Sequence, residues 1–273
     1  PAQIVHAKAV VIASGGFSAN QAMVAKIDPK LKGFATTNQP GATGDGIIMG
    51  EKVGAATVDM KQIQTHPTVV PGNGEMITEA VRGNGAILVN HEGKRFYNEL
   101  ETRDNVSAAI LKQTDKNAFL FFDSDMQKSL KATNNYIKQS YTVTGNSLDE
   151  IAAKMKVPAA ALKQTMTEYA AAVAAKNDKQ FGRADLPRPL NKAPFYAIIV
   201  TPAVHHCMGG IKIDTKTQVY GQNGQIIPGL FAAGEVTGGV HGGNRLGGNA
   251  QADIVTFGHI AGQQAYIYTR LNK

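Results

Sequence analysis

The chain has 273 residues, of which 43% are hydrophobic and 18% charged, and this composition is typical of a folded globular protein. It contains no run of about 18 apolar residues, so we expect no membrane span. The single cysteine, Cys207, excludes an internal disulfide and a Cys-based zinc or haem-attachment motif. The net charge of +7 comes from thinly spread lysines, which predicts a solvated basic surface and no nucleic-acid partner.

The first 60 residues combine an apolar strand with glycine-rich turns. Ala9–Ala13 is apolar and rich in β-branched residues, which predicts a buried strand of the parallel type before the turn 14–16. A short helix follows, with Ser18 as its expected cap and a break near Pro29. Glycines 41, 44 and 46 precede an apolar helix, a pattern that suits a bound anion but is also common in ordinary loops.

The middle of the chain, from about Met60 to Val200, has a different pattern of short strands among helices. Strands are expected in AILVN, AFLFFD and FYAIIV. Ser147 and Glu150 fit a capping box, and Pro158 fits the first turn of the alanine-rich helix that follows. This part predicts an α+β insert.

The last third returns to strands and glycines. Asn223–Gly224 predicts a hairpin turn, Leu230–Ala233 a separate buried strand, and the stretch from about Ala250 to Thr269 a final helix. Two strand-and-glycine segments thus enclose the insert, and such arrangements place a ligand in the crevice between the parts.

A glycine cluster, GGVHGGNRLGGNA, precedes the final helix. Six glycines surround His241 and Arg245 in the stretch Gly238 to Ala250. The glycines alone would suit a phosphate loop. They would equally let the backbone pass close to a cofactor and a substrate, where a Cβ atom would intrude.

Seven segments, in order, resemble the flavoprotein fumarate reductases, in the soluble form found in flavocytochromes c. They are VVIASGGFSAN, TTNQPGATGDG, HPT, ITEAVRGNGAILVNHEGKRFYNELETRD, APFYAI, PAVHHCMGGIKID and PGLFAAGEVTGGVHGGNRLGGNA. The resemblance covers nearly the whole chain. It implies an α/β FAD-binding domain of the Rossmann-like type that is interrupted by an α+β capping domain.

The resemblance also implies how the chain is divided. Residues 1–60 would belong to the FAD-binding domain, 61–204 would form the capping domain, and 205–273 would complete the FAD-binding domain. The Gly-x-Gly-x-x-Gly turn that holds the FAD pyrophosphate in this family does not occur in the sequence. The chain therefore resembles the C-terminal half of such an enzyme, without the N-terminal dinucleotide-binding unit.

The implied reaction is the FAD-dependent reduction of fumarate to succinate. It needs a hydride at one alkene carbon, an acid at the other, and cations that hold both carboxylates. By resemblance, His66 and Thr78 bind one carboxylate. His206 and Arg245 bind the other, and an arginine fork matches a carboxylate with two parallel hydrogen bonds. The implied substrate-binding set also includes Glu79, Gly247 and Gly248.

The implied acid is Arg103 in ELETRD, resupplied through Glu79 and Arg82 of TEAVRG. Arginine side chains normally stay protonated, which makes them poor acids. The carbanion left by hydride addition is strongly basic, however, so a very weak acid can match it, and neighbouring cations lower the cost of releasing the proton. The implied catalytic residues are Arg103, Arg82 and Glu79.

The implied cofactor-binding residues are Ala13, Asp45, His205, Glu235, Ala250 and Gln251. His205 and His206 are adjacent, so in an extended segment one would face flavin and the other substrate. The final helix would direct its positive end at the flavin. Haem is implied only if a cytochrome domain or partner exists outside this chain, and no metal site is expected. We expect Cys207 to be packed, and the remaining histidines to be structural: His6, His91, His241 and His259.

Two alternatives stay open. A related 2-enoate reductase of the urocanate or acrylate type shares this fold, and a non-catalytic fragment or partner chain would lack the pyrophosphate site. The implied partners are fumarate or succinate and an electron-donating cytochrome domain or redox partner. The implied location is the periplasm, with the cytoplasm as the other possibility. The capping domain is expected to close over substrate and exclude water.

Overall fold

The structure is a computed structural model that describes residues 3–272. The chain forms two compact units: unit 1 comprises residues 1–64 and 204–273, and unit 2 comprises residues 65–203. Residues 1, 2 and 273 of the predicted FAD-binding segments lie outside the described residues. Both passages between the units fall within strands, in β3 (Ile63–Val69) and in β7 (Phe195–Cys207). Unit 2 is therefore a continuous insertion into unit 1.

Short strands and four helical segments build the described part of unit 1. One sheet has the order β1-β10-β9, with β1 parallel to β10 and β9 antiparallel to it. The strands of this sheet are β1 (Val10–Ile12), β9 (Gln218–Tyr220) and β10 (Ile226–Ala232). A second sheet has the order β11-β8-β2, from β2 (Thr57–Val58), β8 (Gly210–Lys212) and β11 (Thr237–Gly238). The helical segments are α1 (Gln21–Ile27), the 3-10 helix η1 (Pro29–Leu31), α2 (Asp45–Lys52) and α9 (Asn249–Leu271).

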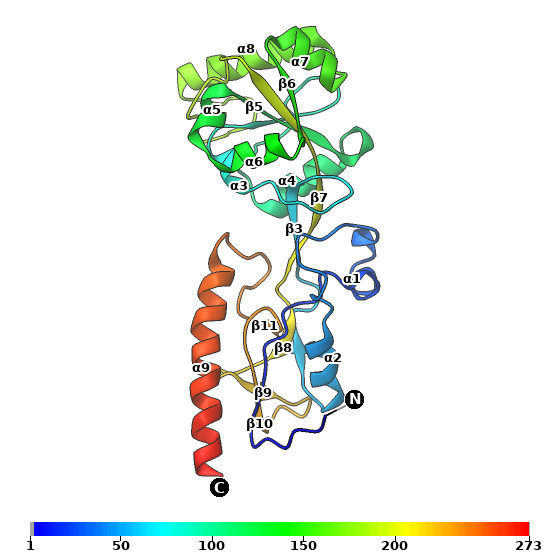
Figure 1. The fold of residues 1–273 in the computed structure, drawn as a ribbon, viewed down its shortest axis with the longest axis vertical. Helices are drawn as coiled ribbons and strands as arrows, with labels where there is room; N and C mark the ends of the chain where they lie inside the picture. The colour runs from blue at the N-terminus through cyan, green and yellow to red at the C-terminus, as the bar shows by residue number, and fades with distance from the viewer. Residues whose placement is uncertain (1–2, 273) are drawn as a thin grey trace. The chain divides into compact units, whose positions relative to one another are not determined.

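The predicted N-terminal strand is confirmed in position and direction, but its predicted burial is wrong. Val10 is 52% exposed and Val11 39% exposed. An apolar sequence shows that a strand can be buried, but not that another element covers it. β1 is an edge strand, and part of its apolar side chains is exposed in the described structure. The long helix α9, red in Figure 1, packs against β10 and β1.

Two further local predictions in unit 1 need correction. The N-cap of α1 is Asn20, whose Oδ1 accepts a hydrogen bond from the Met23 backbone at 3.0 Å. The predicted cap, Ser18, is instead fully buried and accepts a hydrogen bond from the Asn38 side chain at 2.7 Å. Its hydroxyl is thus used in a loop contact two residues before the actual cap.

The predicted hairpin turn at Asn223–Gly224 is confirmed, since Gly224 has a φ of +79° and donates to the Gly221 carbonyl at 2.9 Å. Leu230–Ala233 is wrong as a separate strand, because it continues β10 from the hairpin. The pairing of β10 with β9 shifts between Ile226 and Phe231. Pro228 and Gly229, which are typical of turns, lie inside β10 and divide its apolar residues in the sequence.

Unit 2 is an α+β structure, as predicted. Its sheet has the order β3-β7-β5-β4, with β6 paired to β7, and β7 is antiparallel to β5 and β6. The other strands are β4 (Ile87–Val89), β5 (Ala118–Asp123) and β6 (Thr142–Gly145). The helices are α3 (Glu79–Gly83), α4 (Arg103–Leu111), the 3-10 helix η2 (Thr114–Lys116), α5 (Ser124–Ser129), α6 (Ala132–Lys138), α7 (Leu148–Met155) and α8 (Ala159–Ala175).

The core of unit 2 lies between this sheet and its helices, and every residue of β5 is buried. The capping box is half confirmed: Ser147 Oγ accepts from the Glu150 backbone at 3.1 Å, but Glu150 accepts from the backbone of Asn146 and not from that of Ser147. Pro158 occupies the N-cap of α8, one position before the predicted first turn.

Candidate functional site

The carboxyl ends of the parallel strands β1 and β10 lie side by side in unit 1. Ile12 pairs with Ala232, and the Ala233 backbone donates to the Ile12 carbonyl at 3.1 Å. In α/β proteins, ligands bind at this edge of a parallel sheet. Ala13 follows β1 directly and Glu235 follows β10 closely, so two of the predicted cofactor residues lie at the edge where a ligand is expected.

The start of α2 packs closely on the turn after β1. The Gly44 backbone donates to the Gly16 carbonyl at 3.0 Å. A Cβ atom on Gly46, in the first turn of α2, would lie 2.1 Å from Ser14 Oγ, so only glycine permits this approach. Asp45, another predicted cofactor residue, begins α2 and is exposed at the same edge.

Glu235 holds a central position behind this edge. Its Oε2 lies 3.2 Å from Nδ1 of His206, and its Oε1 accepts from the Cys207 backbone at 2.9 Å. Burial opposes the charged carboxylate, but the hydrogen bond from His206 and its positive potential outweigh burial and lower the pKa of Glu235. Gly16 makes room for this side chain, because a Cβ there would lie 2.5 Å from Oε1.

Cys207 is buried, and burial together with the nearby Glu235 raises the pKa of its thiol. A thiol in this environment is a packed group and a poor nucleophile, as the sequence predicted.

The two adjacent histidines of β7 contact different groups, as extended backbone requires. His205 Nδ1 lies 2.6 Å from the Thr37 hydroxyl, whereas His206 is directed at Glu235. His206 is only 4% exposed, and its Nε2 has no hydrogen-bond partner among residues 3–272. A buried imidazole nitrogen of this kind calls for a polar ligand atom.

Arg245 lies in the segment 238–248, which runs from the last residue of β11 to the start of α9, and it is 6% exposed. Its Nη2 donates to Gln64 Oε1 at 3.2 Å, and Gln64 Nε2 donates back to the Arg245 carbonyl at 2.7 Å. Gln64 thus positions Arg245. The sequence reasoning missed it, because its partner lies 181 residues away.

The glycines of this segment have different tasks. A Cβ on Gly238 would lie 2.5 Å from the Val58 carbonyl oxygen, so this glycine is required by the packing of β11 on β2 and not by a ligand. Gly248 has a φ of +84° and forms the N-cap of α9. In the described structure no side chain caps this helix and its first turn has no acidic residue, so its positive end, with Ala250 and Gln251, suits an anion.

In unit 2, the carboxylate of Glu79 joins the two arginines predicted for proton supply. Arg103 donates from Nε and from Nη2 to its two oxygens, each at 2.7 Å, and Arg82 Nη2 lies 3.7 Å from Oε1. The spacing follows from α3, which begins at Glu79 and ends one turn later, and from α4, which begins at Arg103.

The charges of this group are strongly perturbed. The hydrogen bond from Arg103 lowers the pKa of Glu79 to about 2 against the opposing effect of burial. Burial lowers the pKa of Arg82 from 12.5 to about 10. Arg82 therefore loses its proton more easily than a free arginine, although the nearby Glu79 opposes the effect, and this suits a proton relay.

His66 and Thr78 are the other predicted substrate residues in unit 2. His66 is fully buried on β3, and the Thr68 backbone donates to its Nδ1 at 3.4 Å, which favours the tautomer with hydrogen on Nε2. Thr78 caps α3: its Oγ1 accepts from the Ala80 backbone at 3.5 Å, and its backbone donates to the Tyr136 hydroxyl at 3.1 Å. A carboxylate bound by Thr78 would accept the hydroxyl hydrogen.

A buried ion network behind Arg82 was missed by the sequence reasoning. Glu99 is fully buried and accepts from Arg95 Nε at 2.8 Å and from Arg183 Nη1 at 3.2 Å. Arg82 Nη1 donates to the Glu99 carbonyl at 2.6 Å. The charge spacing of Arg95 and Glu99 in KRFYNELETRD was a visible signal, but it does not reveal Arg183, 84 residues further on.

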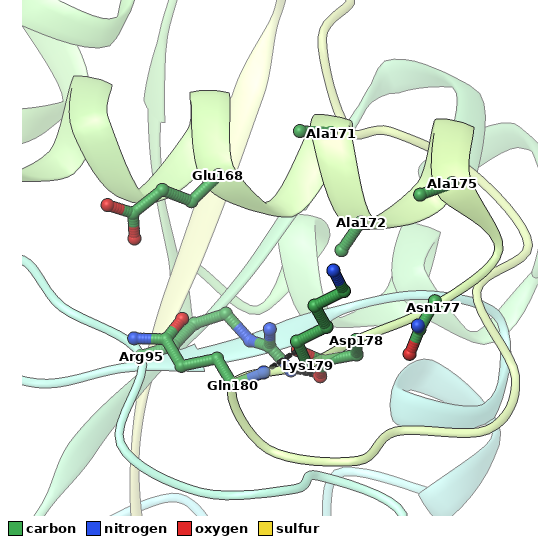
Figure 2. Close-up of a pocket in the computed structure, with 9 residues that line it drawn as sticks. All are labelled: Arg95, Glu168, Ala171, Ala172, Ala175, Asn177, Asp178, Lys179 and Gln180. Carbon is green, nitrogen blue, oxygen red and sulfur yellow. Dashed lines mark hydrogen bonds and ion pairs between the residues drawn. The ribbon is translucent and has the colours of Figure 1, made fainter.

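The pocket in Figure 2, with a volume of about 470 Å³, lies beside this network between α8 and the loop 177–180. Arg95 in its wall donates to Asp178 at 2.9 Å, and bonds to Glu99 and Asp178 outweigh burial and raise the pKa of Arg95. Alanines of α8 line much of the rest. Arg95 and Asp178 pair with each other, so this wall of the pocket joins the segment that carries Arg95 to the loop 177–180, while Glu168 and Lys179 also line it.

The described residues contain no cluster of three or more histidine, cysteine, aspartate or glutamate side chains that could hold a metal ion. Among the same residues, none of the helices combines the length and the apolar character that crossing a membrane requires.

The strand edge of unit 1 fits a flavin: a close-packed glycine turn, the buried Nε2 of His206 and the uncapped positive end of α9 all belong to it. These features define a flavin-binding protein. Residues 2–250 match the FAD binding domain family, and the chain belongs to this family of flavoproteins, whose cofactor is FAD.

The chain is similar to a fumarate reductase (cytochrome) of Shewanella frigidimarina, with 54% identity over 98% of this chain and 47% of that protein. It is 42% identical to an NADH:acrylate oxidoreductase of Vibrio harveyi over 94% of this chain and 26% of that protein. The solved open conformation of a flavocytochrome c3 fumarate reductase is 44% identical, with a TM-score of 0.80 over 96% of this chain and 46% of that chain. This likeness confirms the predicted fold. The chain spans about half the length of the curated fumarate reductases that it matches.

The predicted site residues fall in both units. The structure brings Glu79, Arg82 and Arg103 into contact within unit 2, and His206 and Glu235 into contact within unit 1. Of the other substrate residues, His66 and Thr78 belong to unit 2, while Arg245, Gly247 and Gly248 belong to unit 1.

Proposed function

We propose that this protein is an FAD-dependent fumarate reductase that forms succinate. The contact of Arg82, Glu79 and Arg103 carries the proposal, because the Glu79 carboxylate touches both arginines and, with 40% of its side chain exposed, can exchange protons, unlike the fully buried Glu99. The identity of 54% to a protein named fumarate reductase supports the same reaction.

Arg103 is the proposed proton donor to the alkene carbon. Glu79, whose pKa is lowered to about 2, is a carboxylate at neutral pH. After Arg103 has given its proton to substrate, Glu79 accepts a proton from Arg82 and passes that proton to the neutral Arg103, which leaves Arg82 to be reprotonated from solvent. The distances favour the exchange at Arg103, at 2.7 Å, over that at Arg82, at 3.7 Å. Arg82 would therefore have to move closer for its step.

The proposed carboxylate ligands are His66 and Thr78 for one end of fumarate, and His206 and Arg245 for the other. One observation favours the opposite roles for the two neighbouring histidines, His205 and His206. His206 is bonded to Glu235, a proposed cofactor residue, whereas His205 is less buried. In this second assignment His205 binds substrate and His206 faces the flavin. Separate His205→Ala and His206→Ala variants distinguish the two: the substrate ligand raises KM, and the flavin neighbour changes the flavin absorbance.

The proposed FAD-contacting residues are Ala13, Asp45, His205, Glu235, Ala250 and Gln251. When bound, FAD supplies the hydride for the other alkene carbon. The chain's own contribution at this point is the close-packed edge of β1 and β10 and the positive end of α9, which stabilises negative charge on the flavin ring.

The experiment is an anaerobic assay of the intact, FAD-loaded protein with reduced methyl viologen as electron donor and fumarate, acrylate or urocanate as acceptor. We expect kcat/KM for fumarate to exceed the other two by at least about a hundredfold, because a site that binds both carboxylates loses a charged contact with each analogue. A preference for acrylate or urocanate would support the related 2-enoate reductase. A colourless protein that binds no added FAD would support the non-catalytic reading.

The remaining assignments rest on resemblance. We propose an electron-donating cytochrome domain or redox partner, a periplasmic location, and a substrate-closing role for unit 2. Hydrogen exchange with and without succinate tests the last of these: we expect added protection around Arg103, and its absence would argue against closure.

A further inference from the structure

Four side chains of unit 1 form a chain in which two imidazoles lie between two carboxylates. Asp253 Oδ2 lies 3.0 Å from His241 Nε2. The rings of His241 and His206 meet edge to face, with centroids 5.3 Å apart and an interplanar angle of 78°. His206 Nδ1 then lies 3.2 Å from Glu235 Oε2. Only His241 and Asp253 have no part in the function proposed above.

Asp253 is an expensive residue to bury. It is 5% exposed, and its Oδ1 has no hydrogen-bond partner within the described part of the chain. A buried carboxylate destabilises a protein unless both of its oxygens are paired. His241 pairs with only one oxygen of Asp253, so a purely structural role does not account for this residue. Its place in the second turn of α9, near the positive end of the helix, offsets part of the cost.

The hydrogen bond to Asp253 determines how His241 is held. A carboxylate accepts, so Nε2 of His241 carries the hydrogen and the ring is fixed at that end. The fixed ring packs against the imidazole of His206 and limits its rotation. Asp253 therefore acts on His206 through His241.

The same bond anchors the segment 238–248. His241 lies between Gly239 and Gly242, which have φ values of +86° and +62°, so the backbone on both sides is intrinsically free. The segment is tied at His241 to α9 and at Arg245 to Gln64. Gln64 also donates to Asn244, at 2.5 Å, so loss of the bond at His241 removes the anchor on the β11 side of Arg245 and leaves the contacts with Gln64.

We propose that His241 and Asp253 are positioning residues that hold His206 and Arg245 as one preformed binding set for a substrate carboxylate. The inference rests on the proposed function, in the assignment that makes His206 a substrate ligand, and deepens it. It gives a role to His241, which the sequence assigned to structure alone.

The test compares variants of the intact, FAD-loaded protein. His241→Phe keeps an aromatic ring against His206 but removes the bond to Asp253, and His241→Gln keeps a donor for that bond. Asp253→Asn keeps the shape and removes the charge. His259→Gln is the matched control, because His259 is an exposed histidine on α9.

We expect His241→Phe and Asp253→Asn to raise KM for fumarate about tenfold or more while kcat stays within about threefold, because substrate binding loses its preorganisation and the proton path in unit 2 is intact. His241→Gln should recover most of the loss. The second readout is hydrogen exchange without substrate, in which the 238–248 amides should exchange faster in His241→Phe than in the control.

Wild-type KM together with unchanged exchange in His241→Phe and in Asp253→Asn would overturn the proposal, and so would an equal loss in His241→Gln and His241→Phe. If His241→Phe fails to fold, Asp253→Asn and His241→Gln still decide the question. If the wild-type protein turns over no fumarate, the proposed function has failed. The exchange of the 238–248 amides then tests the anchor separately.

Discussion

The contacts of the Glu79 carboxylate show which site residues can be predicted from the sequence and which cannot. Glu79, Arg82 and Arg103 came from the resemblance, and their mutual contact follows from one short helix and the start of another. The contact of Gln64 with Arg245 and that of Glu99 with Arg183 could not be predicted, because the fold brings each partner from a distant part of the chain. Sequence spacing reports neighbours along one element, and side-chain support across elements needs the tertiary structure.

Glu79→Gln is expected to lower kcat for fumarate by about a hundredfold or more, since an amide cannot relay a proton and general acid catalysis contributes about 10²- to 10⁴-fold. KM should change much less. Steady-state kinetics checks this, with Glu101→Gln as the control because Glu101 is an exposed carboxylate of the same ELETRD motif. An active Glu79→Gln enzyme would remove Glu79 from the proton path.

The lowered pKa of Arg82 predicts an alkaline limit. Its folded pKa is about 10 and its ordinary value 12.5, so Arg82 keeps its proton below about pH 10 and releases it above, while a free arginine would still be charged. We expect kcat to be constant up to about pH 9 and to fall through pH 10. In Arg82→Gln, kcat should be lower and this fall absent. A fall of the same shape in the variant would assign it to another group.

At the scale of elements, β1 shows that the sequence pattern predicts the strand but not its burial. The sequence correctly predicted a parallel strand, because its composition encodes strand formation. Burial also requires another element that covers the strand, and the sequence of the strand does not show whether such an element is present. Val10, Val11, Met49 and Val53 line an apolar hollow of about 590 Å³ and are 39% to 62% exposed. Exposed apolar groups gathered in this way mark an interaction surface.

We predict that the dinucleotide-binding unit implied by the family resemblance covers this surface in the intact protein. Val11→Lys should then reduce FAD retention after gel filtration of the intact protein, because a charge would be buried against the covering unit. Ile199→Lys is the control, since Ile199 is a strand residue of unit 2 with a similar exposure of 38%. Equal FAD content in the two variants would contradict the prediction.

At the scale of the whole molecule, the two units differ in how the chain builds them. Unit 1 needs both ends of the chain, whereas unit 2 is one continuous stretch with its own sheet and core. The change of pattern along the sequence predicted such an insert. The pairing of Arg95 with Glu99 is visible in the sequence as a spacing of four, but the burial of this pair and its contact with Arg183 could not be predicted.

Residues 65–203 alone are expected to fold, because their ends lie in the neighbouring strands β3 and β7 and their core is self-contained. Circular dichroism should show a cooperative thermal transition. Glu99→Gln should lower its stability by about 3–5 kcal/mol, since it removes the charge that balances two buried arginines. A noncooperative melt of the wild-type segment would show that unit 2 depends on the rest of the chain.

Arg183 also sets an order of events during protein synthesis. Its guanidinium donates to the carbonyls of Arg82 at 2.8 Å and Ala86 at 2.9 Å, which precede it by 101 and 97 residues. The turn that carries Arg82 has its local backbone hydrogen bonds early, but it lacks the two bonds from Arg183 until the ribosome has released residue 183. The nascent chain completes its proton-relay turn late, and any product truncated before this arginine would retain the relay residues without the scaffold that orders them.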